Sequence, residues 1–192
     1  MRRFSPIFLS LAAGAVITAP AQTCGTHCGT ERWPVKTMTD ADRGKISFIP
    51  AITTVSQLRN LDAPPQRPDS ARVSPTELTT FQIHAVLIGW KLEADQDMHL
   101  VIADPADPTR TMIAEVPSAT CDHVCSSEEA TEFQAARAAL IARLGTPTSS
   151  FHRLAAPLPI VLTGVGFFDF LHGQTGVAPN GIELHPVLRV DF

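Results

Sequence analysis

The hydrophobic period of the chain changes twice between residues 81 and 192, and this change restricts the folds that the sequence can adopt. Three segments have the alternating, β-branched and aromatic character of strands, namely 81–93, 97–104 and 111–116. Residues 127–144 instead follow a helical period, with an apolar stripe made of Phe133, Ala136, Leu140 and Leu144. Two more strand segments follow, 158–164 and 182–190. The pattern predicts three strands, one helix and two strands.

This order of elements is that of the OB-fold, a small barrel. We therefore expect residues 81–192 to form one mainly β domain with one helix, an α+β fold of the OB-like β-barrel type with the strand order βββ-α-ββ. Gly89, inside the first strand, predicts a bulge or a bend. Residues 22–80 are rich in Pro, and the stretch 62–75 carries four prolines. We expect these residues to form an irregular N-terminal extension.

The first 21 residues have the features of a cleavable signal peptide. Arg2 and Arg3 precede an apolar run too short to cross a bilayer comfortably, and the run ends at the small residues Ala19 and Ala21. Cys24 follows Thr23 rather than a small residue, which argues against a lipid anchor. We expect an exported protein, periplasmic or secreted, without a membrane anchor.

Four cysteines follow the expected cleavage site in two C-x-x-x-C pairs, Cys24 with Cys28 and Cys121 with Cys125. In an oxidising compartment, structural disulfides are the first expectation. We favour bridges between the two pairs, because these would tie the N-terminal extension to the domain, although the spacing leaves the connectivity open. The alternative is a zinc or copper site in which His27 or His123 joins the thiolates.

Charge and composition argue against nucleic acids as partners. Loss of Arg2 and Arg3 with the signal peptide changes the formal net charge from −4 to −6, and the chain has no Lys/Arg cluster to neutralise phosphates. Aromatic residues make up 6% of the chain, with no Tyr, so a stacking platform for bases is poorly supported. The Gly-rich segment 171–181 follows neither the Walker nor the Rossmann pattern, and we expect no nucleotide cofactor.

Two predicted strands each carry an acid and a histidine two positions apart. Asp97 with His99, and Glu183 with His185, therefore share a face of their strands. The intervening residues are apolar and must face the core, so we expect the polar pairs to point away from the barrel interior, toward a half-exposed surface. In OB topology the third strand lies beside the second and the fifth, so Glu115 can lie near either pair, depending on the register.

These residue types are suited to metal-assisted hydrolysis. We expect His99, Glu115 and His185 to be catalytic, and a divalent metal to be held by Asp97, His172 and Glu183. Bound water would attack an ester, a lactone or a phosphodiester. The alternative is a non-catalytic exported module that binds a small molecule or an exported partner, in which the polar pairs only brace the sheet.

Three stretches carry a resemblance to known proteins: "DMHLVIAD", "MIAEVPSATC" and "IELHPVL". Over residues 95–192 they resemble a group of uncharacterised exported bacterial proteins that combine D-x-H-L-V with a later E-[I/L]-H-P-V. The resemblance implies a small barrel and brings no activity with it. The strand order is also similar to that of staphylococcal-type nucleases, but their arginine-and-carboxylate pattern is not matched, so no residue is carried over from them.

Overall fold

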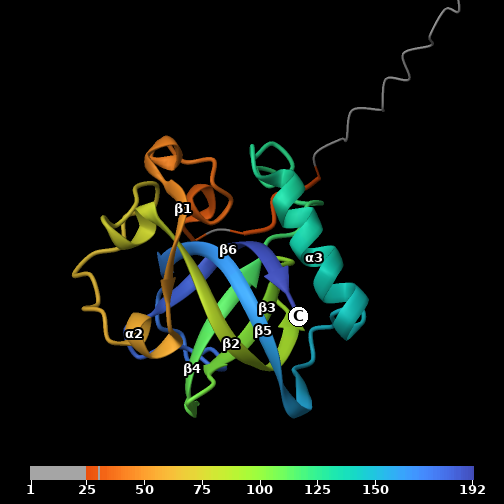
Figure 1. Cartoon of the computed structure of the whole chain (residues 1–192). Helices are drawn as coiled ribbons and strands as arrows, with labels where there is room; N and C mark the ends of the chain where they lie inside the picture. The colour runs from red at the N-terminus through yellow and green to blue at the C-terminus, as the bar shows by residue number, and fades with distance from the viewer. Residues whose placement is uncertain (1–24, 30) are drawn as a thin grey trace, which may run out of the picture.

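The structure, a computed structural model, describes residues 25–29 and 31–192. Five strands form a ring (Figure 1): β2 (Thr79–Leu92), β3 (Met98–Asp104), β4 (Asp107–Val116), β5 (His152–Phe168) and β6 (Ile182–Asp191). Each strand pairs with two others of the ring, in the order β2-β3-β4-β6-β5 and back to β2. All of these pairs are antiparallel except β4–β6, which is parallel and short.

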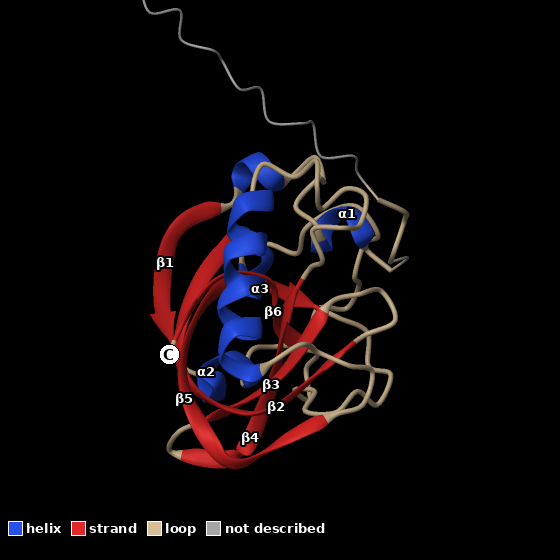
Figure 2. Ribbon diagram, turned by 90° about the vertical axis from the view of Figure 1, so that its right-hand side faces the viewer, coloured by secondary structure: helices blue, strands red, loops and turns tan. Residues whose placement is uncertain are grey.

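The five predicted strands and the helix lie where the period of the sequence predicts them. The helix, α3 (Ala130–Leu144), lies across the ring and packs mainly against β6 (Figure 2). Ala136 and Leu140 belong to the main core, and Phe133 belongs to a second, smaller apolar cluster. The predicted irregularity at Gly89 is also present, because the β2–β3 register shifts between Leu87 and Gly89.

The N-terminal extension is more ordered than the sequence predicts. It contributes α1 (Trp33–Lys36), α2 (Val55–Arg59), two 3₁₀ helices (η1, Arg43–Lys45; η2, Thr76–Leu78) and a sixth strand, β1 (Ser47–Thr53). The fold is thus a mainly β sheet of six strands with one substantial helix, and the predicted order βββ-α-ββ is wrong in omitting β1. β1 pairs in parallel with the start of β2 at the edge of the sheet. An edge position tolerates Pro50, which a central strand would not.

The stretch 62–75 contains no helix or strand, as its prolines predict. The core inside the ring is built from the apolar residues that alternate along the strands, among them Met98, Leu100, Ile102, Ala114, Ile182 and Leu184. Burial of these side chains is the main stabilising contribution to the ring.

A disulfide fastens the N-terminal extension to the loop before α3. Cys28 and Cys121 are bonded across 93 residues of sequence, which confirms one predicted bridge between the two cysteine pairs. No described cysteine is free. Cys24 lies outside the described residues, so the second bridge stays a prediction, as does the signal peptide 1–21. None of the helices in residues 25–29 and 31–192 is long and apolar enough to cross a membrane.

Candidate functional site

The alternation of the strands gathers five acids and histidines on the outer face of the ring. We call these residues the acid–histidine cluster: Asp97, His99, Glu115, Glu183 and His185. Their apolar neighbours belong to the core, so the polar side chains point to the opposite face, as predicted. In the register of the sheet, His99 faces Glu115 across β3–β4, and Glu183 faces Ile113 across β4–β6. Glu115 therefore lies between the two histidines and contacts both of them.

The acid–histidine cluster is buried, and the expectation of a half-exposed surface is wrong. The exposed fraction of its members lies between 0% and 6%. The outer face of the ring is covered by residues of the N-terminal extension and of the loop after β5. Trp33 and Met38 pack with Phe133 and Val165 in the second apolar cluster, and the Thr175 carbonyl reaches His99. The sheet alternation predicted the direction of the side chains, whereas the cover comes from distant segments.

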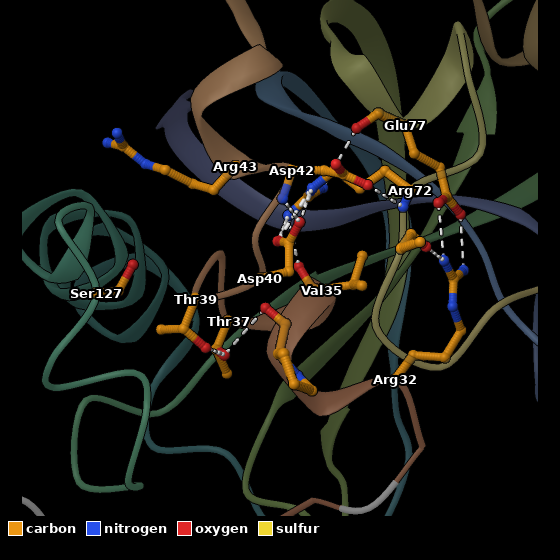
Figure 3. A network of polar contacts seen from close by, with 12 residues as sticks. Arg32, Val35, Thr37, Thr39, Asp40, Asp42, Arg43, Arg72, Glu77 and Ser127 are labelled. Atoms are coloured by element: carbon orange, nitrogen blue, oxygen red, sulfur yellow. Dashed lines mark hydrogen bonds and ion pairs between the residues drawn. The ribbon is translucent and has the colours of Figure 1, made fainter.

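A buried ionic network holds this cover in place (Figure 3). The guanidinium of Arg32 donates to both carboxylate oxygens of Glu77 at 2.7 and 2.8 Å, and neither side chain is exposed. Glu77 also accepts bonds from the backbone N–H groups of Val73 and Phe168. Because every charged atom has partners, the pair can be buried without an orphaned charge. A second buried pair, Arg72 with Asp40, has its closest N–O contact at 2.6 Å.

His99 is fixed by one backbone carbonyl and two carboxylates. Its Nε2 lies 3.0 Å from the carbonyl oxygen of Thr175, which can only accept, so Nε2 carries a hydrogen. Its Nδ1 lies 2.8 Å from Oε1 of Glu115 and 3.2 Å from Oε1 of Glu93. Nδ1 therefore faces two negatively charged oxygens. Either a proton or a metal ion must lie between the ring and these carboxylates.

His185 lies at the centre of the acid–histidine cluster. Its Nδ1 is 3.1 Å from Oε2 of Glu115 and 3.2 Å from Oε1 of Glu183, and its Nε2 is 3.2 Å from Oδ2 of Asp97. The contact with Asp97 has the length of an ion pair but is not aligned as a hydrogen bond, and both oxygens of Asp97 lack a hydrogen-bond partner. The ring of Phe167 packs against the imidazole at 5.4 Å between centroids.

The acids of the acid–histidine cluster differ in the direction in which their pKa values are shifted. Burial would raise the pKa of Glu115, but its hydrogen bonds with His185 and His99 outweigh burial and hold the pKa well below its usual range. Burial, assisted by the charge of Glu115, raises the pKa of Glu183 to about 7, and burial raises the pKa of Asp97. Although burial opposes it, the surrounding carboxylates raise the pKa of His185 well above its usual value. Glu115 and His185 thus form a charged pair.

An open pocket of about 340 Å³ reaches Glu115 from outside. Half of the residues that line it are acidic: Glu31, Glu93, Asp95, Glu115 and Asp169. Lys36 of α1 is the one cationic residue among the described residues that line it. Burial would lower the pKa of Lys36, but the nearby carboxylates, Asp169 first among them, outweigh burial and raise it. The ammonium therefore stays charged.

Two sets of side chains are arranged as metal donors: Glu93, His99 and Glu115, and Asp97, Glu115 and His185. Within each set the possible ligand atoms lie within 4.8 Å of one another. Ligand atoms about 2.1 Å from one ion lie about 3 Å apart at right angles, close to the spacing of His99 from its two carboxylates. The first set opens to the pocket through Glu93 and Glu115, whereas Asp97 and His185 are fully buried. The first set leaves room for further ligands.

The structure brings together five of the six predicted catalytic and metal-binding residues. The sixth, His172, lies apart in the loop after β5, where Nε2 contacts Glu31 at 3.1 Å and the side chain is 52% exposed. We therefore withdraw His172 as a ligand. Two further residues of the candidate site, Glu93 and Lys36, were not predicted. Glu93 ends the first predicted strand, opposite the start of the next, and this position could have suggested it; no sequence signal marks Lys36.

Comparison of the chain with protein-family models, with curated proteins and with solved structures gave no match.

Proposed function

We propose that this protein is an exported, divalent-metal-dependent hydrolase, whose ion is held by Glu93, His99 and Glu115 at the wall of the acidic pocket. The observation that carries the proposal is the position of His99. The Thr175 carbonyl takes its Nε2–H, so Nδ1 is directed at two carboxylates that also line the pocket. A histidine that ligates a metal through one nitrogen commonly donates the other N–H to a carbonyl in this way.

In this proposal Glu93, His99 and Glu115 supply three donors, and the pocket supplies the space for water and substrate. A divalent ion bound there would lower the pKa of a coordinated water and polarise the substrate. The ligand types, imidazole and carboxylate, suit zinc or manganese better than copper(I) or a thiolate-bound ion. The disulfide between Cys28 and Cys121 removes these two thiolates as ligands and supports an oxidising, extracytoplasmic location.

His185 acts as a positioning residue. It holds Oε2 of Glu115, which leaves Oε1 directed at His99 and the ion. Asp97 and Glu183 contact His185 from two further sides. The previously expected catalytic role of His185 and the metal-binding roles of Asp97 and Glu183 are thereby replaced by support of Glu115. These three residues do not line the pocket, so we assign them no direct contact with the substrate.

We also assign the ring to the OB-like barrel type. Support comes from the ring order, in which the third of the five strands, β4, pairs with both the second, β3, and the last, β6. The short parallel β4–β6 pairing leaves the ring less regular than a fully hydrogen-bonded barrel.

The test is metal content and hydrolysis, measured together on the purified mature protein. After incubation with Zn²⁺ or Mn²⁺ and removal of free metal, we expect about one ion per chain and metal-dependent hydrolysis of a generic ester, lactone or phosphodiester. The His99→Gln variant should lose both the bound metal and the metal-dependent hydrolysis. His84→Gln is the matched control, because His84 is an exposed residue of β2. A wild-type protein that takes up no metal would contradict the proposal.

The second candidate is a non-catalytic binding module. It is favoured by the mutual pairing of the acid–histidine cluster, in which both histidines already have carboxylate partners. In that case Glu115 braces β3 and β6, and the acidic pocket binds a small cationic ligand. Metal-free protein whose stability is unchanged by added Zn²⁺ or Mn²⁺ would favour this candidate.

A further inference from the structure

Lys36 is the feature of the pocket that the metal donors do not explain. It belongs to α1, lines the pocket beside Glu115 and Asp169, and is only 7% exposed. Its Nζ lies 5.7 Å from the centroid of the Phe167 ring. Within the described part of the chain, this side-chain nitrogen forms neither a hydrogen bond nor an ion pair. A buried ammonium without such a partner is costly, and most buried lysines are paired.

The surrounding carboxylates keep this ammonium charged but accept no hydrogen bond from it. Asp169, Glu115, Glu183 and Asp95 all act on it electrostatically, yet none forms an ion pair with it. The N–H donors of Lys36 are therefore available to an oxygen atom of a molecule bound in the pocket. Since Glu115 is both a proposed metal ligand and a neighbour of Lys36 in the pocket wall, such an oxygen would lie close to the ion.

We propose that Lys36 binds the carbonyl oxygen of the substrate, and that the substrate is a small, neutral carboxylic ester or lactone rather than a phosphodiester. This inference rests on the function proposed above. When the oxygen of water bonds to the carbonyl carbon, the C=O electron pair moves to the oxygen that faces Lys36. The ammonium stabilises this charge. Collapse breaks the bond to the alkoxy group, which leaves with the proton given up by the water, so an acid and an alcohol result.

The charge of the pocket decides between the two substrate classes. Five carboxylates and one ammonium line it, and the carboxylates still outnumber the positive charges when the proposed divalent ion is counted, so a phosphodiester anion would enter against a net negative field. A neutral ester or lactone meets no such repulsion, and its carbonyl requires only one donor. The open pocket, of about 340 Å³, has room for a small ester or lactone beside Lys36.

The experiment compares Lys36→Met and Lys36→Arg with the zinc-loaded wild type, using p-nitrophenyl acetate and bis(p-nitrophenyl) phosphate. Lys45→Met is the matched control, because Lys45 is 66% exposed and paired with Asp42. For Lys36→Met we expect unchanged zinc content and a kcat for the ester that falls on the order of 100-fold, with little change in KM. Lys36→Arg should recover part of the loss. Lys45→Met should behave as the wild type.

Failure of this inference differs from failure of the proposed function. Folded, zinc-loaded Lys36→Met with the kcat of the wild type would overturn the role of Lys36 while leaving the metal site intact. A wild type that cleaves the phosphodiester faster than the ester would overturn the substrate class, and this comparison needs no variant. A wild type without zinc-dependent hydrolysis would overturn both proposals. A thermal melt of each variant shows which ones are folded.

Discussion

Nε2 of His99 lies 3.0 Å from the carbonyl oxygen of Thr175. Because a carbonyl cannot donate, this contact fixes the hydrogen of the ring on Nε2 and leaves Nδ1 to face Glu115 and Glu93. A neutral imidazole in this orientation would direct a lone pair at two carboxylates. The arrangement is stable only with a positive charge at Nδ1, from a proton or from a metal ion.

Glu115→Gln should remove the central acid of the acid–histidine cluster. Both imidazoles would lose their closest carboxylate. We therefore expect loss of metal retention and a free energy of unfolding that is lower by about 3–5 kcal/mol. Asp97→Asn is the matched variant, since Asp97 is buried and neither of its oxygens is hydrogen-bonded. It should cost less than Glu115→Gln, because His185 keeps its contacts with Glu115 and Glu183. Urea unfolding at pH 7 measures both, and equal losses would contradict the central role of Glu115.

Glu183→Gln should change how stability depends on pH. The pKa of Glu183 is raised from 4.5 to about 7, so the protonated acid is favoured in the folded state. Its stabilising contribution is full below pH 4.5 and is lost as the pH rises through 7. Gln resembles the protonated acid, so the variant should match the wild type at low pH and exceed it by on the order of 3 kcal/mol above pH 7. The free energy of unfolding is measured across this pH range, with Glu132→Gln as the control because Glu132 is exposed. A stability difference between variant and wild type that does not vary with pH would contradict the raised pKa of Glu183.

The Arg32–Glu77 pair should be strongly coupled. Arg32→Met leaves the fully buried Glu77 without its cation, and we expect a loss of about 3–5 kcal/mol. Arg32→Met combined with Glu77→Leu should lose less than the sum of the two single changes, because no isolated charge remains. A double-mutant cycle of unfolding free energies measures the coupling. Additive losses would mean that the pair does not hold the cover over the acid–histidine cluster.

The mature protein should contain two disulfides. Intact mass under non-reducing conditions should be lower by four hydrogens than that of the reduced chain, two of which come from the Cys28–Cys121 bond. Replacing Cys28 and Cys121 by Ser should decrease the free energy of unfolding by about 2–4 kcal/mol, since the bond closes a long loop of the unfolded chain. Free thiols at these positions in protein from an oxidising compartment would contradict the prediction.

The strands and the direction of their side chains could be predicted because they depend on local alternation. Met98 and Leu100 must enter the core, so Asp97 and His99 point the other way, and the same holds for Glu183 and His185 around Leu184. The sequence placed Glu115 near either pair, depending on the register, and only the observed register puts it beside both.

The burial of these residues could not be predicted, because it depends on contacts that are distant in sequence. Arg32 meets Glu77 across 45 residues, and Cys28 meets Cys121 across 93. Neither pairing has a local sequence signal. β1 was not predicted because it contains Pro50. A proline is acceptable in this strand only because β1 lies at the edge of the sheet. Lys36, on a helix of four residues, gave no periodic pattern at all.

The most direct test of the proposed metal site is a long-range ¹H–¹⁵N NMR spectrum of the histidine rings, recorded before and after one equivalent of Zn²⁺. The proposal predicts that Nδ1 of His99 moves to the chemical shift of a metal-bound nitrogen while Nε2 keeps its hydrogen, because the Thr175 carbonyl holds it. Glu93→Gln should weaken this change, and the exposed His84 should show none. Resonances of His99 that stay unchanged at saturating Zn²⁺ would contradict the proposed site.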